Sequence, residues 1–114
     1  MQIKKIGILF VFVLLVLSAA AHPPKKITLK FDVKTQELDV KIDHSVKNMN
    51  EHFIKKIVVK VNGTEVLSKD YSKQKDMKAD VYRITLKNVN AGDEVELTAS
   101  CNKWGKKSKK LVVK

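Results

Sequence analysis

Residues 53–69 read FIKKIVVKVNGTEVLSK, and this stretch decides the fold class. Residues 53–61 form the most apolar strand pattern of the domain, and residues 65–69 return with a second, more polar one. Between them stands Asn62-Gly63, and Asn-Gly between two strand patterns is the strongest short signal for a two-residue β-hairpin. The stretch therefore predicts an antiparallel hairpin rather than a helix.

The chain on either side of this hairpin also alternates apolar and polar residues with a period of two. The further predicted strands are 27–31, 38–42, 81–86, 95–101 and 109–113. Polar turns or loops separate them, and no segment has an apolar stripe of helical period. About seven short strands predict an all-β, immunoglobulin-like antiparallel β-sandwich. The disulfide and core Trp that are typical of antibody domains are absent from the pattern.

The N-terminus has the three parts of a secretory signal peptide. Lys4-Lys5 is positively charged, residues 6–17 are almost entirely apolar, and small residues follow at 18–21. The apolar run is shorter than the roughly 20 residues that cross a bilayer as a helix. We therefore expect residues 1–21 to be removed and residues 22–114 to form one exported domain, periplasmic or extracellular, with no stable membrane span.

The charge of the expected mature domain is strongly positive but is carried by lysine. Residues 22–114 contain 21 Lys and Arg and 12 Asp and Glu, a net charge of +9, and Arg83 is the only Arg. Proteins that recognise nucleic acids depend on bidentate Arg contacts to bases and on aromatic residues that stack on them. Both Arg and aromatic residues are scarce in this sequence. The lysines alternate with apolar residues, as on solvated strand faces. We expect no nucleic-acid partner and some attraction of small anions.

Three histidines and one cysteine are the candidate metal ligands of this sequence. His22, His44, His52 and Cys101 all fall at predicted strand ends or in loops, where sandwich proteins place binding groups. Imidazole and thiolate together suit iron, copper or zinc and disfavour calcium and magnesium. Metal binding has two alternatives: the histidines are ordinary polar residues in loops, and Cys101 is a buried residue that packs in the core. A single Cys cannot form an internal disulfide, so a dimer cross-link is the remaining possibility.

Three segments of the chain match the motif order of a known family. Residues 44–57, HSVKNMNEHFIKKI, resemble a motif in which one His begins a loop and a second starts His-aromatic-Ile-x-x-Ile. Residues 101–105, CNKWG, are similar to Cys-Asn-x-His-Gly, and residues 22–24, HPP, to His-x-Pro. In this order, over nearly all of residues 22–114, the chain resembles the superoxide reductases, whose iron domain is also called desulfoferrodoxin or neelaredoxin.

The resemblance implies an open site that holds one iron ion on an immunoglobulin-like sandwich. His22, His44 and His52 would be equatorial ligands and Cys101 the axial one. The implied activity is reduction of superoxide to hydrogen peroxide with an external electron-donor protein. Trp104 stands where the family has its fourth His, so a water or Met49 would have to take that place. The loop between His44 and His52 is also longer than is usual in the family.

Two other functions compete with this interpretation. The string from His52-Phe53-Ile54 to residue 66 also resembles the SoxZ sulfur-oxidation carrier subunit, a protein-binding module without metal, in which Cys101 would be incidental. Cleavage just before His22 would instead place a free amine beside its imidazole, and the two together could chelate copper.

Overall fold

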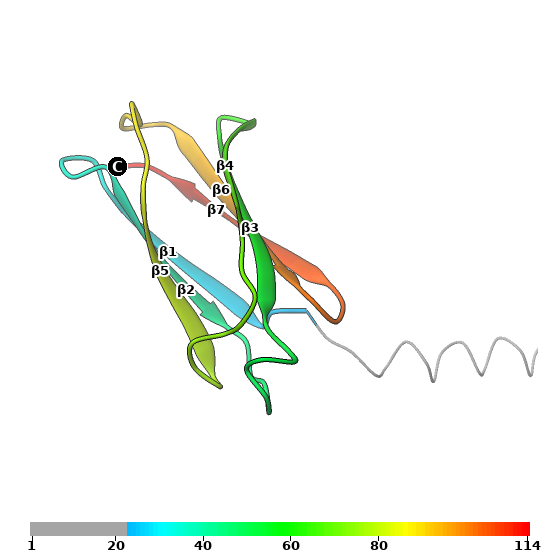
Figure 1. The fold of residues 1–114 in the computed structure, drawn as a ribbon. Coiled ribbons are helices and arrows are strands. Elements are labelled where there is room, and N and C mark those ends of the chain that lie inside the picture. The colour runs from blue at the N-terminus through cyan, green and yellow to red at the C-terminus, as the bar shows by residue number, and fades with distance from the viewer. Residues whose placement is uncertain (1–22) are drawn as a thin grey trace, which may run out of the picture.

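The computed structural model describes residues 23–114, and the predicted signal peptide and His22 lie outside them. This part of the chain folds into seven strands (Figure 1). They are β1 (Lys26–Asp32), β2 (Glu37–Asp43), β3 (Ile54–Val61), β4 (Thr64–Asp70), β5 (Ala79–Thr85), β6 (Glu94–Cys101) and β7 (Lys106–Val112). Within residues 23–114 there is no helix of the length and apolarity that a membrane crossing requires.

The strands form two antiparallel sheets that pack face to face. One sheet has the order β1-β2-β5 and the other the order β4-β3-β6-β7. Strand β4 pairs with its hairpin partner β3, so the sheets have three and four strands. The chain crosses between sheets from β2 to β3, from β4 to β5 and from β5 to β6. The prediction of an all-β, immunoglobulin-like sandwich of about seven strands is confirmed.

Apolar side chains at alternate positions fill the space between the two sheets. The largest fully buried apolar residues are Leu38, Ile42, Ile54, Ile57 and Leu97. In β6 the buried positions are every second residue from Val95 to Cys101, so Cys101 continues the inward-facing row. Period-two alternation therefore places Cys101 on the core side at the end of its strand.

The hairpin of residues 53–69 forms as predicted. Val61 pairs with Thr64 across a two-residue turn. Asn62 has φ 50° and Gly63 has φ 83°, and positive φ at both central residues is the requirement of a type I′ turn. Asn62 also donates a hydrogen bond to Asp93 and accepts one from the Glu94 backbone, which joins this turn to the start of β6.

Two strand boundaries differ from the predicted ones by more than one residue. Strand β7 begins at Lys106 instead of residue 109, and β5 begins at Ala79 instead of residue 81. Strand β7 lies at a sheet edge, and all its residues except Leu111 are exposed, so four lysines on both of its faces concealed the alternation. An edge strand with exposed lysines on both faces is a common protection against edge-to-edge pairing.

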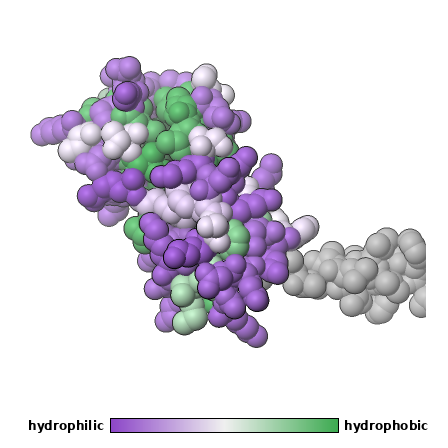
Figure 2. Space-filling view, in the orientation of Figure 1, coloured by the Kyte–Doolittle hydropathy of each residue, from purple (hydrophilic) through white to green (hydrophobic). Residues whose placement is uncertain are grey.

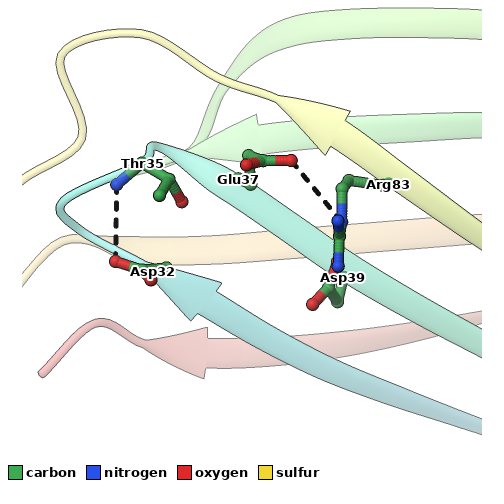
Figure 3. Close-up of polar contacts among 5 residues, drawn as sticks. All are labelled: Asp32, Thr35, Glu37, Asp39 and Arg83. Carbon is green, nitrogen blue, oxygen red and sulfur yellow. Dashed lines mark hydrogen bonds and ion pairs between the residues drawn. The ribbon is translucent and has the colours of Figure 1, made fainter.

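The outer face of the three-stranded sheet carries charged side chains that form ion pairs with one another. Arg83 on β5 bonds to Asp39 on β2 at 2.8 Å and lies 3.5 Å from Glu37 (Figure 3). The hydrogen bond from Arg83 holds the pKa of Asp39 below its usual value. Figure 2 shows that hydrophilic residues cover most of one side of the domain, with a hydrophobic patch toward its upper end. The sole Arg of the chain thus has a structural role on a sheet surface.

Candidate metal site

Three of the four predicted ligands meet at one end of the sandwich. His44 directly follows β2, His52 stands two residues before β3, and Cys101 is the last residue of β6. These strand ends lie together at the lower end of the domain in Figure 1. The ligand atoms of the three residues all lie within 4.8 Å of one another. Residues far apart in the sequence are thus brought together by the antiparallel arrangement.

The contacts inside this cluster are close and specific. His52 Nε2 lies 3.0 Å from Cys101 Sγ. The rings of His44 and His52 meet edge to face, with centroids 4.7 Å apart and planes at 90°. His44 and Cys101 are buried, 1% and 3% exposed, and His52 is half-buried. The group therefore sits just beneath the surface and offers two imidazole nitrogens and one sulfur to a common point.

The ligand atoms are close enough together for one metal ion to contact all three. Bonds of about 2.0–2.1 Å to nitrogen and 2.3 Å to sulfur allow two ligands of one ion to lie up to about 4.4 Å apart. His52 Nε2 and Cys101 Sγ are 3.0 Å apart, at hydrogen-bond distance from each other. The three ligand atoms lie within 4.8 Å of one another, so an ion would need to draw them together by only a few tenths of an ångström.

Asn102 connects the loop that carries His52 to the end of β6 by hydrogen bonds. Its side chain accepts a hydrogen bond from Phe53 N at 2.8 Å and donates one to Glu51 O at 2.9 Å. Its backbone N donates to Phe53 O at 3.0 Å. Three bonds on both sides of His52 hold this residue against Cys101, which gives Asn102 a physical role next to the Cys in the Cys-Asn-x-x-Gly pattern.

Gln74 makes two hydrogen-bond contacts to His44, one to its ring and one to its backbone. The sequence places Gln74 in a charged connection between β4 and β5, yet its side chain is only 2% exposed. Its Oε1 lies 2.7 Å from His44 Nδ1, and its Nε2 donates to the backbone oxygen of His44 at 2.7 Å. Sequence reasoning missed this residue, because no local pattern separates Gln74 from the lysines beside it.

A shallow depression of about 410 Å³ opens next to the cluster. It is lined by Pro23, Pro24, Lys25, His44, Ser45 and Lys107. Lys107 comes from β7 and Lys25 from the segment before β1, so two separate parts of the chain contribute a positive charge to the same opening. Of the cluster, it is His44 that faces this depression.

Gly105 allows the N-terminal segment to approach this end of the domain. A Cβ on Gly105 would lie 2.8 Å from Pro23 Cβ, and Gly105 has φ +86°. Only a glycine adopts this positive φ without strain and also leaves room for Pro23 without movement of the backbone. The Gly of the Cys-Asn-x-x-Gly pattern is therefore the residue against which Pro23 lies.

The other predicted participants are placed as follows. His22 lies outside the described residues, immediately before Pro23 in the sequence. Trp104 is 56% exposed. Met49 is half-buried, and its backbone oxygen accepts a hydrogen bond from Gln74 N at 2.9 Å.

The His44, His52 and Cys101 group could bind a metal ion. Comparison of the chain with protein-family models, with curated proteins and with solved structures found no match. The chemistry of the site therefore has to be argued from its own residues.

Proposed function

We propose that this chain binds one iron ion through His44, His52 and Cys101 and reduces superoxide to hydrogen peroxide. The observation that carries the proposal is the convergence of two imidazoles and the single thiol at one end of the sandwich, within 4.8 Å. His22 is the fourth ligand in this proposal. Its neighbour Pro23 lines the same depression as His44.

The geometry favours a metal over the two alternative roles of Cys101. A cysteine that only packs the core, or that is incidental in a protein-docking domain, needs at most one hydrogen-bond partner, whereas two imidazoles lie with Cys101 in one group. Here Cys101 Sγ lies 3.0 Å from His52 Nε2 at the surface end of the core.

Each protein group has a distinct part in the proposed chemistry. Cys101 gives up its proton when it ligates, since a thiolate is the binding form. A ferrous ion held there would supply the single electron that reduces superoxide, while solvent supplies two protons. Lys25 and Lys107 place positive charge at the depression and so raise the local concentration of a small anion.

The proposal requires a partner that returns the electron. Within residues 23–114 Cys101 is the sole cysteine, so this part of the chain holds no second redox centre built from thiolates. We propose that an external electron-donor protein reduces the site after each turnover. Export of the domain to the periplasm or beyond, directed by residues 1–21, belongs to the same proposal.

Metal analysis and spectroscopy of the purified protein test the iron centre. Protein produced without added metal should contain one iron per chain, and its oxidised form should show a thiolate-to-ferric charge-transfer band. Cys101→Ser should abolish the band. Ala99→Ser is the matched control, since Ala99 is the preceding inward position of β6 and is fully buried. It should lower stability but keep the band.

A superoxide assay tests the activity separately. The reduced protein should convert superoxide to peroxide until its iron is oxidised, and addition of a reductant should restore the reaction. Iron-free protein, or an iron content that is the same in Cys101→Ser, would overturn the proposed site. An iron-loaded protein that leaves superoxide unchanged would overturn only the reaction.

A further inference from the structure

The connection from β4 to β5 contributes one fully buried polar side chain to the metal end of the domain. Gln74 is 2% exposed, although the lysines on both sides of it are exposed. Its backbone N donates to Met49 O at 2.9 Å, which ties it to the loop between His44 and His52. A buried amide needs partners for both of its ends, so its bonds define how it is oriented.

The hydrogen bonds of Gln74 determine which end of its amide faces His44. Gln74 Nε2 donates to two backbone oxygens, those of His44 and Asp76, both at 2.7 Å. Oxygens only accept, so the NH₂ group must point at them, and Oε1 is left facing His44 Nδ1 at 2.7 Å. Since Oε1 also only accepts, the hydrogen of this bond belongs to Nδ1.

We propose that Gln74 is a positioning residue that holds His44 in the Nδ1–H form and aims its Nε2 lone pair at the metal ion. The inference rests on the proposed metal site. Partners of this kind set the tautomer and the ring orientation of a metal-binding His. Gln74 forms hydrogen bonds with both the ring and the backbone oxygen of His44. One side chain therefore restrains both the rotation of the ring and the movement of the backbone.

The main chain around His44 reinforces the same orientation. His44 N donates to Lys78 O at 2.9 Å and Val46 N to Met77 O at 2.7 Å. These bonds extend the pairing of β2 and β5 beyond the sheet and bring the 71–78 connection against the ligand. The connection that reads as a charged linker in the sequence therefore acts as a support for one side of the site.

The nitrogen resonances of His44 in the metal-free protein test the assignment directly. At a pH at which the imidazoles are neutral, two-bond ¹H–¹⁵N spectra should show His44 protonated on Nδ1. Gln74→Glu keeps an acceptor for that hydrogen and should keep this form. Gln74→Leu removes the acceptor, and the Nε2–H form should then appear. A parent spectrum with His44 protonated on Nε2 overturns the proposal.

Cobalt(II) titration measures the consequence for metal binding. Gln74→Leu should bind about 10–100-fold more weakly than the parent chain, the usual effect of losing such a partner. Gln74→Glu should recover part of that loss. If a folded Gln74→Leu variant binds cobalt as tightly as the parent, the positioning role is wrong. Should Gln74→Leu fail to fold, the nitrogen spectrum of the parent chain decides, because it reports the protonated nitrogen of His44 without any substitution.

Gln36 provides a matched control at the other end of the sandwich. Its Nε2 donates to Val33 O and Val89 O, and its Oε1 accepts from Val89 N. Gln36→Leu should therefore lower stability but leave cobalt affinity and the His44 spectrum unchanged, and an equal loss of affinity would overturn the proposal. A parent chain that binds no cobalt would overturn the proposed metal site itself, while the spectrum still decides the tautomer.

Discussion

Replacement of Gly105 by alanine tests how the N-terminal segment is connected to the metal site. The added Cβ would lie 2.8 Å from Pro23 Cβ and 3.0 Å from Pro23 Cα. Carbon atoms in contact lie about 3.5–4.0 Å apart, so Pro23 must move by about 0.7 Å or more. Metal–ligand distances tolerate only about 0.2 Å of error. If His22 is a ligand, Gly105→Ala should weaken cobalt or iron binding at least tenfold, an effect of the size seen for other supporting residues.

Alanine substitutions at the other two glycines with positive φ separate the displacement of Pro23 from the backbone strain that any such substitution causes. Gly63 has φ +83° and Gly92 has φ +92°, and a Cβ at either position would meet nothing within 4 Å. An alanine at any of the three positions costs about 1–2 kcal/mol, because left-handed backbone is unfavourable for residues with a Cβ. Pro23 is exposed, so its displacement adds little to this cost.

Urea unfolding of the metal-free variants and metal titration of the same samples form the assay. We expect similar losses of stability in Gly63→Ala, Gly92→Ala and Gly105→Ala, and a loss of metal affinity in Gly105→Ala alone. Unchanged affinity in Gly105→Ala would refute the reasoning, because it would mean that the segment before β1 contributes nothing to the site. An equal loss in all three variants would attribute the effect to global stability instead.

Three further predictions concern the core, the loop and alkaline pH. Ile57→Ala should lower the free energy of unfolding by about 2–5 kcal/mol, since Ile57 is fully buried, and urea unfolding with Val58→Ala as the half-buried control measures this. Asn102→Ala should cost about 1–3 kcal/mol and weaken metal binding, because two hydrogen bonds to the loop before β3 are lost; unchanged metal affinity would contradict this. Burial, followed by its hydrogen bond to Asp80, raises the pKa of Tyr82, so the native state keeps this proton where the unfolded state loses it. Stability should therefore fall as the pH rises through about 10, and less steeply in Tyr82→Phe, as alkaline unfolding followed by tyrosinate absorbance would show.

Local patterns were sufficient to predict the strands with strong alternation and the turn at Asn62-Gly63. Both depend on contacts between near neighbours, and Asn-Gly needs no tertiary support to favour positive φ at two positions. The start of β7 was mispredicted because its lysines are exposed on both faces, which removes the signal that alternation provides. Which strands pair without a hairpin between them, such as β2 with β5 and β3 with β6, was also beyond the pattern, because these pairings join segments far apart in the sequence.

The sequence by itself determined the class of the fold and which four residues could ligate a metal, because strand periodicity and ligand chemistry are properties of the residues alone. Only the tertiary structure decided that His44, His52 and Cys101 meet, since their spacing depends on how β2, β3 and β6 end together. It also decided the role of Gln74, a residue thirty positions from His44. A hydrogen bond between such distant residues exists only after the sheets have packed, so no local pattern in the sequence records it.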